Sequence, residues 1–336
     1  MPERTQQREA FLAACGLAGS RLFPLAGDAS FRRYFRLSGA AGRWVLMDAP
    51  PEREDVRPFL QLARHLRALG YSAPEIIATD AEAGFLLLED LGEATYTRVL
   101  AETGMEEPLY RLAMDLLIDL HRKPLAEGVP PGLSAYTDAR FLEEACLLLD
   151  WYLPAVTGKP VPEKARAAYA ALWPPLFAHV RSVPETLVLR DYHVDNLIYL
   201  PEREGVRACG LLDFQDAVRG PAAYDVVSLL EDARRDLSPG LVDRMCARYV
   251  EAFPALDRQA FARAYAILGA QRNCKILGIF TRLFRRDGKS AYLAHIPRVW
   301  RLLEGDMKAG VLAPLRAWLD ANLPVALRKT PEAEGG

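Results

Sequence analysis

Hydrophobic positions in the N-terminal part of the chain recur mostly with a two-residue period. Within 31–37, Phe31, Arg33, Phe35 and Leu37 alternate with Arg32, Tyr34 and Arg36, which is typical of a half-exposed β-strand. Further short apolar runs predict strands at 21–25, 43–47, 76–78 and 84–88. An amphipathic helix is expected before Gly16, and a second one after Asp55, with Pro58 tolerated in its first turn.

Beyond Gly92 the hydrophobic spacing becomes that of helices. Leucines at helical spacing predict a helix over 106–122. The same reasoning predicts helices at 138–152, 161–181, 221–232, 240–253, 257–284 and 291–322. Pro174-Pro175 should kink or break one of them, and the polar tail 329–336 should be disordered.

Residues 187–214 interrupt this helical part with short strands. Two apolar runs, 197–200 and 206–212, are joined by a polar turn and predict a β-hairpin. We therefore expect a two-lobed α+β fold. A β-rich N-lobe would span residues 1–91, and a helical C-lobe residues 92–328, with a hinge where Gly92 frees the backbone.

Composition narrows the class of protein. The net charge of −2 gives no general attraction to nucleic acid or to anionic lipid, and no apolar run approaches the ~20 residues of a membrane helix. The five cysteines are odd in number and lack C-x-x-C spacing. They are typical of free thiols in a reducing compartment, so we expect a cytoplasmic protein.

Three oxygen-bearing side chains surround the predicted hairpin. Asp191 follows an apolar run, Asn196 comes five positions later, and Asp213 ends the second strand. Phosphoryl transfer from ATP needs a base for the attacking hydroxyl and oxygen ligands for magnesium. Each residue alone would be an ordinary turn residue, but the combined spacing favours Asp191 as the base and Asn196 and Asp213 as magnesium ligands.

Two neighbouring residues have less specific roles. His193 could be a metal ligand, but a buried histidine that supports the loop is favoured because no partner histidine is near in sequence. Asp225 either caps the next helix or fixes the catalytic loop. A metal-dependent hydrolase using Asp191, His193 and Asp195 is disfavoured, since such sites require more histidines than the five scattered ones here.

These motifs resemble the aminoglycoside phosphotransferase/choline kinase-like family, relatives of the protein kinases. The resemblance covers the β-rich N-lobe, the hinge Leu86–Leu91, the Asp191/Asn196 loop and Asp213 with Asp225. Some segments are closer to the bacterial cell-wall sugar kinases, which phosphorylate the anomeric hydroxyl of N-acetylmuramate and N-acetylglucosamine. These segments are 26–30 with Arg33-Tyr34, Met47–Glu52, and Asp213–Ala217 with Gly220-Pro221.

The resemblance implies a protein-kinase-like fold that uses ATP and Mg²⁺. The turn 26–30 would cover the phosphates through Ser30 and the neighbouring Arg32, while Glu89 and Leu91 would present backbone groups to adenine. The family's lysine at the end of the third strand is missing, since no lysine precedes Lys123. Either an arginine replaces it (Arg32, Arg33 or Arg43), or magnesium and backbone alone hold the phosphates. A catalytically inactive nucleotide-binding protein therefore stays an alternative.

The acceptor side is less specific in sequence. An amino sugar with a carboxylate would need cations and polar groups, and the candidates are Arg190, Gln215, Arg219, Arg272 and Lys275. Arg272 and Lys275 could share one helix face, or belong to a solvated face without a ligand. Aminoglycosides, choline, homoserine and other small alcohols remain alternative acceptors, and the sequence does not indicate an oligomeric state.

Overall fold

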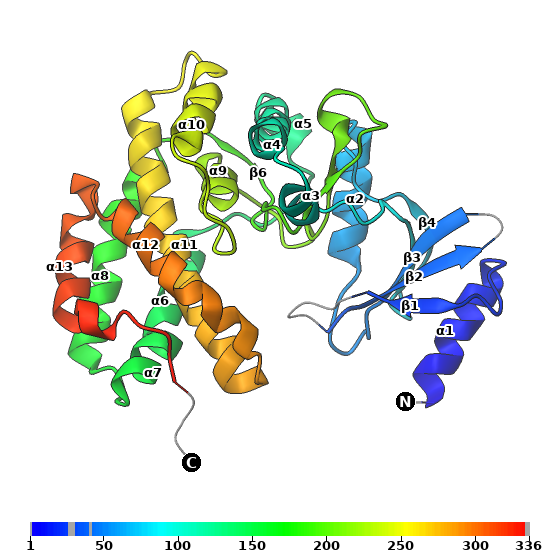
Figure 1. Ribbon diagram of the computed structural model, residues 1–336, viewed down its shortest axis with the longest axis horizontal. Helices are drawn as coiled ribbons and strands as arrows, with labels where there is room; N and C mark the ends of the chain where they lie inside the picture. Colours follow the sequence, from blue (N-terminus) through cyan, green and yellow to red (C-terminus); the bar gives the residue numbers. More distant parts are fainter. Residues whose placement is uncertain (1, 26–30, 40–41, 333–336) are drawn as a thin grey trace. The chain divides into compact units, whose positions relative to one another are not determined.

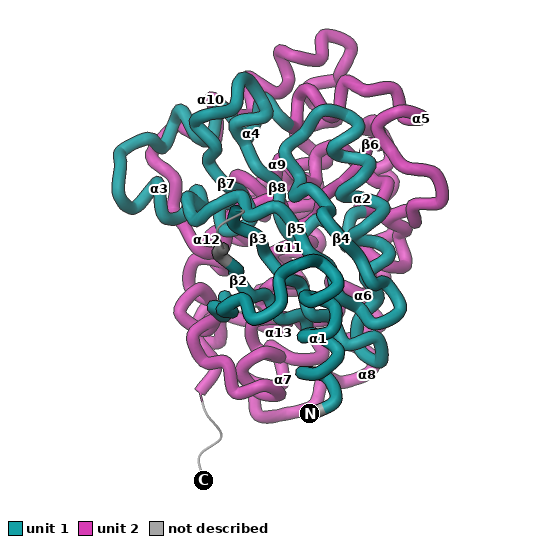
Figure 2. Tube along the Cα trace, turned by 90° about the vertical axis from the view of Figure 1, so that its right-hand side faces the viewer, with its two compact units in different colours: residues 1–116, 194–217 teal, residues 117–193, 218–336 magenta. Residues whose placement is uncertain are grey.

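The computed structural model describes residues 2–25, 31–39 and 42–332. The chain forms two compact units, coloured separately in Figure 2: residues 1–116 with 194–217, and residues 117–193 with 218–336. The predicted lobe boundary near residue 92 stays a prediction. The units divide the chain elsewhere because segment 194–217 packs with the N-terminal residues.

Unit 1 contains a five-stranded antiparallel sheet in the order β1-β2-β3-β5-β4 (Figure 1). Its strands correspond to those expected from the sequence: β1 (Leu22–Pro24), β2 (Arg33–Gly39), β3 (Gly42–Asp48), β4 (Ile76–Asp80) and β5 (Phe85–Glu89). The helix α1 (Pro2–Ala14) buries Phe11 and Leu12 in one cluster with strand side chains, namely Leu37, Leu46, Phe85 and Leu87. Met47 alternates with these positions and is also buried, so both faces of the sheet are covered.

The other elements of unit 1 connect this sheet to the predicted hairpin. They are α2 (Arg57–Ala68), α3 (Tyr96–Glu102), the first part of α4 (Glu106–His121), β7 (Leu197–Tyr199) and β8 (Cys209–Leu211). The Thr95 hydroxyl caps α3 by accepting the N–H of Arg98 at 3.2 Å. The hairpin strands are shorter than expected because Gly205–Ala208 form a 3₁₀ turn.

Unit 2 is built around the long helix α11 (Arg258–Asp287), against which α6 (Asp138–Leu147), α8 (Glu163–Val180), α9 (Ala223–Leu230) and α12 (Ile296–Asp306) pack. Gly278 permits a close crossing, since a Cβ there would lie 2.4 Å from the backbone of Leu147. The chain continues from Leu147 as a π-helical turn. The remaining elements are α5 (Leu125–Gly128), α7 (Leu153–Thr157), β6 (Glu185–Val188), β9 (Val218–Pro221), α10 (Leu241–Glu251), α13 (Ala313–Asn322) and short 3₁₀ turns at 290–295, 310–312 and 325–327.

Three expectations for unit 2 need correction. A break at Pro174-Pro175 is wrong: α8 continues through both prolines, since buried neighbours such as Trp173 and Phe177 hold its turns in place. The single helix expected over 291–322 is interrupted between Asp306 and Ala313. The antiparallel pair β6–β9 was not foreseen, because it joins residues that are thirty or more positions apart in sequence. Of the tail 329–336 that is expected to be disordered, residues 333–336 lie outside the described residues. Within 329–332, the Lys329 carbonyl accepts the Tyr152 hydroxyl at 2.8 Å and Pro331 is buried.

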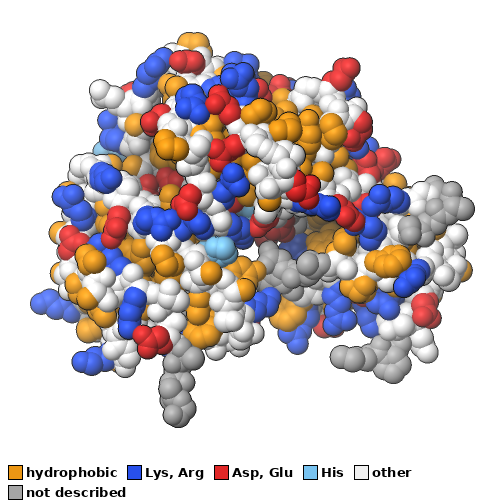
Figure 3. Space-filling view, viewed as in Figure 1, with side chains coloured by type: hydrophobic (Ala, Val, Ile, Leu, Met, Phe, Trp, Pro, Cys, Tyr) orange, Lys and Arg blue, Asp and Glu red, His pale blue; other side chains and the backbone are white. Residues whose placement is uncertain are grey.

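On the face that Figure 3 shows, positive and negative side chains are interspersed on each unit, as the net charge of −2 leads one to expect. None of the described helices is both long and apolar enough to span a membrane.

Candidate active site

The two predicted magnesium ligands lie side by side in unit 1, at the open end of the hairpin. Asn196 directly precedes β7, and its Nδ2 donates to Asp213 Oδ2 at 3.4 Å. The N–H of Leu212 donates to the backbone carbonyl of Asn196 at 2.9 Å, which fixes the two segments together. Gln215 Nε2 donates to Asp213 Oδ1 at 2.7 Å. A carboxylate beside an amide whose oxygen can turn to a cation is a donor set that fits magnesium.

Strained backbone marks this region. Asp213 has φ of 57° and Arg190 has φ of 68°, and they are the only non-glycine residues with positive φ in the described part of the chain. Such conformations cost energy and concentrate at functional sites. One of the two is a predicted magnesium ligand, and the other directly precedes the predicted base.

Arg32 is the best placed of the three arginines considered as replacements for the missing lysine. It hydrogen-bonds the Tyr34 side chain, and its Nε lies 3.6 Å from Glu54 Oε2. Burial raises the pKa of Tyr34 to about 12, with the positive charge of Arg32 lowering it and the negative charge of Asp213 raising it. The charges of Arg32 and of Asp213, the predicted magnesium ligand, therefore both act on the Tyr34 hydroxyl.

The other two arginines are less suitable. Arg43 lies at the opposite end of β3 from buried Met47, is 58% exposed, and pairs with Asp90 at 3.3 Å. Arg33 is an exposed residue of β2 opposite Asp48. The predicted phosphate turn 26–30, including Ser30, lies outside the described residues.

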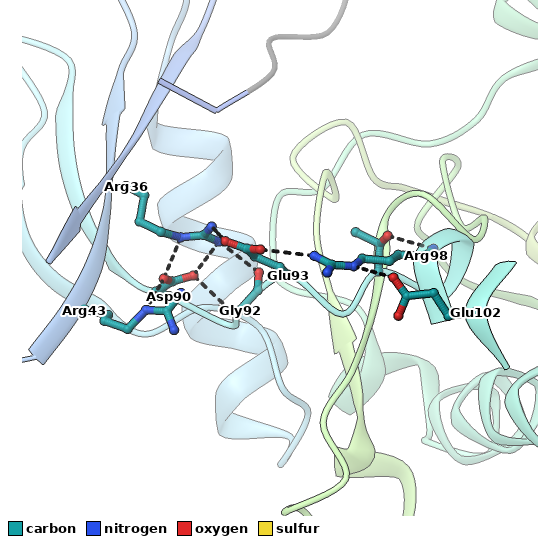
Figure 4. Close-up of polar contacts among 8 residues, drawn as sticks. Arg36, Arg43, Asp90, Gly92, Glu93, Arg98 and Glu102 are labelled. Carbon is teal, nitrogen blue, oxygen red and sulfur yellow. Dashed lines mark hydrogen bonds and ion pairs between the residues drawn. The ribbon is translucent and has the colours of Figure 1, made fainter. Parts of the chain in front are cut away.

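The hinge that follows β5 is held by a chain of ion pairs, shown in Figure 4. Arg36 of β2 forms a hydrogen-bonded ion pair with the carboxylate of Asp90, and Arg98 of α3 pairs with Glu93 at 3.1 Å. Glu89 ion-pairs with Arg203 in the turn of the hairpin. Sequence reasoning missed Arg36 and Arg203, because their partners are far away along the chain.

Glu89 and Leu91, the two residues predicted to contact adenine, make different contacts within unit 1. The N–H of Glu89 already donates to the carbonyl of Glu75 at 2.8 Å, so an adenine contact there would use its carbonyl oxygen. The Leu91 side chain packs against Ile198 and Leu200 of the hairpin. Both adenine contacts stay predictions.

In unit 2, helix α9 fixes the loop that carries the predicted base. Asp225 accepts the N–H groups of Leu189 at 2.6 Å and Arg190 at 2.9 Å, and Ser228 Oγ donates to the Arg190 carbonyl at 2.9 Å. Asp225 and Ser228 are three residues apart and therefore share one face of α9. Of the two roles considered for Asp225, these bonds favour fixing the loop. Burial raises the pKa of Asp225 to about 7, although the two backbone N–H groups lower it.

The charges around Asp191 keep its carboxylate ionised. Burial alone would raise the pKa of Asp191, but its electrostatic interactions with Lys275, His193 and the nearby arginines bring it below its ordinary value. An ionised carboxylate at neutral pH can accept a hydroxyl proton. Burial is also the main reason that the pKa of His193 is lowered, which fits the interpretation of His193 as a buried residue of the loop.

Three of the five predicted acceptor residues are buried cations of unit 2. Arg190 Nη2 lies 2.6 Å from Glu144 Oε1, and Lys275 Nζ lies 3.2 Å from Glu144 Oε2. Arg272 donates to Ser228 Oγ at 2.9 Å. These three cations are buried, so a solvated helix face is the wrong interpretation of Arg272 and Lys275.

The remaining two acceptor candidates have other partners. Arg219 is half-exposed and pairs with Glu185 at 3.2 Å. Gln215 belongs to unit 1, where it contacts Asp213. Binding of an acceptor by any of the five residues stays a prediction.

Comparison with known proteins identifies the class. Residues 22–265 match the phosphotransferase enzyme family, and the chain belongs to this family. Solved structures share its fold. A choline/ethanolamine kinase family protein from Mesorhizobium loti has a TM-score of 0.61 at 15% identity and covers 95% of this chain and 99% of its own. The GDP complex of wild-type aminoglycoside 2′-phosphotransferase-IIIa has a TM-score of 0.61 at 16% identity. The match covers 91% of this chain and 98% of the phosphotransferase.

More similar relatives carry a specific name. The N-acetylmuramate/N-acetylglucosamine kinase of Caulobacter vibrioides is 37% identical to this chain, over 97% of this chain and 99% of its own length. The protein of the same name from Pseudomonas aeruginosa is 39% identical, over 85% of this chain and 83% of its own length. The predicted family and the two-lobed α+β, protein-kinase-like fold are thereby confirmed.

Proposed function

We propose that this protein is an ATP- and Mg²⁺-dependent kinase that phosphorylates the anomeric hydroxyl of N-acetylmuramate and N-acetylglucosamine. The observation that carries this proposal is the similarity to the Caulobacter kinase, which extends over nearly the full length of both chains. The retained Asp191, Asn196 and Asp213 support turnover. The expected cellular role is the return of peptidoglycan sugars to synthesis as 1-phosphates in the cytoplasm.

Each residue has a distinct part in the proposed reaction. Asp191 orients the sugar hydroxyl and accepts its proton, and the bonds from Asp225 to the preceding backbone keep the loop rigid. Asn196 and Asp213 would hold magnesium, which when bound neutralises charge on the phosphates. Arg32 takes the part of the missing lysine, and its proximity to Tyr34 supports this assignment.

Two alternatives make different predictions. A phosphotransferase for an aminoglycoside, choline or homoserine keeps the same machinery and changes the acceptor. A nucleotide-binding protein without turnover is favoured by the missing lysine and opposed by the intact carboxylates and by Arg32.

An acceptor panel tests the proposal. The protein is incubated with ATP, Mg²⁺ and, in turn, N-acetylmuramate, N-acetylglucosamine, kanamycin, choline and homoserine, and the phosphorylated product is identified by mass spectrometry. We expect sugar 1-phosphates. The control Asp191→Asn should lower turnover about 10²–10⁴-fold, the typical contribution of a general base, with nucleotide affinity nearly unchanged. Transfer to kanamycin but to neither sugar would refute the acceptor, and nucleotide binding without any transfer would favour the inactive protein.

A further inference from the structure

The carboxylate of Asp90 is the centre of the hinge contacts in Figure 4. Arg36 binds it with two nitrogens: Nε lies 2.8 Å from Oδ2 and Nη2 lies 3.0 Å from Oδ1. This is the planar, two-pronged geometry in which arginine and carboxylate interact most strongly. The Asp90 side chain is 1% exposed, so without a cation its charge would be buried and uncompensated.

The same two side chains also fix the peptide groups of Gly92. Its N–H donates to Asp90 Oδ1 at 2.9 Å, and its carbonyl accepts from Arg36 Nη2 at 3.0 Å. Gly92 has φ of 90°, in the left-handed region that favours glycine. The turn from Asp90 to Gly92 is therefore held at both ends.

Leu91, in the middle of this turn, connects the hinge to the hairpin. Its side chain is buried against Ile198 and Leu200, and Leu212 packs on the same cluster. Leu212 directly precedes Asp213, the predicted magnesium ligand. The position of Leu91 therefore bears on both the hinge backbone and the metal end of the hairpin.

We propose that Arg36 is a positioning residue for nucleotide binding, which acts through Asp90 and Gly92 to set the backbone of Leu91. The inference rests on the proposed use of ATP, but on no particular acceptor. Without the arginine fork, the turn loses both its clamp on Asp90 and its bond to the Gly92 carbonyl. The backbone that faces adenine is then less ordered before binding. The free-energy cost of ordering it on binding lowers the affinity for the nucleotide.

Arg43 supplies a matched control, because it contacts the same carboxylate. Its Nε lies 3.3 Å from Asp90 Oδ2, but its side chain is 58% exposed, and the guanidinium that donates to the Gly92 carbonyl is that of Arg36. Exposed ion pairs contribute little. A lost charge near Asp90 is therefore common to both variants, whereas the fixed turn and the ion pair with Glu93 are lost only with Arg36.

The test compares Arg36→Met, Arg36→Lys and Arg43→Met with the natural protein. The Kd of ADP is measured by calorimetry with and without Mg²⁺ and without any sugar, and folding is checked by thermal unfolding. We expect the Kd to rise about tenfold in Arg36→Met, the change produced by losing a hydrogen bond to a charged group. Arg43→Met should change it by less than about twofold. The KM for ATP should rise in Arg36→Met while the KM for the acceptor stays unchanged.

Several outcomes would overturn the inference. Equal ADP affinity in Arg36→Met and the natural protein would do so, as would equal losses in the Arg36 and Arg43 variants. If Arg36→Met does not fold, Arg36→Lys decides: it keeps the charge but not the fork, so natural affinity in that variant contradicts the proposal. Failure of the natural protein to bind ADP would overturn the nucleotide proposal itself, whereas normal ADP binding with no sugar turnover would affect only the acceptor.

Discussion

Glu144 offers the most direct test of how unit 2 holds the catalytic loop. Its carboxylate lies between two cations, 2.6 Å from Arg190 Nη2 and 3.2 Å from Lys275 Nζ. The side chains of Glu144 and Arg190 are only 11% and 10% exposed. Glu144→Gln keeps the shape of the side chain but removes the negative charge that lies against both cations.

The magnitude of the effect follows from this burial. Removing one partner of a buried ion pair destabilises a protein by about 3–5 kcal/mol, because the other charge stays buried and uncompensated. We expect a loss of this size in the free energy of unfolding, measured by urea denaturation at pH 7. Tyr136→Phe is the control: it removes a neutral hydroxyl that donates to Glu144 Oε2, and should cost about 0.5–1.5 kcal/mol.

The pH dependence provides a second, independent measurement. Burial raises the pKa of Glu144, but the charges of Lys275 and Arg190 outweigh it, so the pKa lies below its ordinary 4.5. Its stabilisation is therefore fully present above pH 4.5 and is lost as the pH falls through the lowered folded-state pKa. The stability difference between the natural protein and Glu144→Gln should shrink in that range. A difference below about 1 kcal/mol at pH 7, as for an exposed pair, would refute the reasoning.

Two further predictions concern the remaining carboxylates. Asp213→Ala should weaken the binding of ADP in the presence of Mg²⁺ but leave binding without Mg²⁺ nearly unchanged, because only the predicted metal ligand is lost. Calorimetric titrations with and without Mg²⁺ measure both affinities. Equal weakening in the two titrations would contradict the metal assignment. The pKa of Asp225 is raised to about 7, so its contribution to stability is fully present below its ordinary value of 3.8 and is lost as the pH rises through 7. Asparagine at this position cannot ionise. As the pH rises from 5 to 9, the free energy of unfolding of Asp225→Asn, measured by urea denaturation, should therefore increase relative to that of the natural protein. A difference that stays constant over this range would show that Asp225 does not titrate there.

Local spacing along one continuous segment predicts a candidate site at Asp191, Asn196 and Asp213. Asp191 and Asn196 belong to a single loop and Asp213 ends the hairpin that follows it, so their order along the chain already implies one functional unit. The adjacency of Asn196 and Asp213 follows from antiparallel pairing of two short strands. Period-two alternation likewise predicted the sheet of unit 1, because one face of each strand is buried.

The supporting residues could not be predicted in this way. Glu144 is 46 residues before Arg190, and Arg36 is 54 residues before Asp90, so neither pair leaves a periodic signal. The sequence also allowed Lys275 to belong to a solvated helix face, because its burial depends on the helices that pack around α11. Long-range packing decides which charged residues become internal.

The strain at Arg190 shows how such long-range contacts act on the site. Arginine has no short polar side chain to stabilise the left-handed region locally, so φ of 68° costs roughly 1–2 kcal/mol. Asp225 binds its N–H, Ser228 binds its carbonyl, and Glu144 binds its guanidinium. Glycine at this position would relieve the strain but would remove one of the two buried cations, Arg190 and Lys275, that contact the Glu144 carboxylate. The conformation next to Asp191 is therefore imposed by α6 and α9, and not by the preferences of the loop itself.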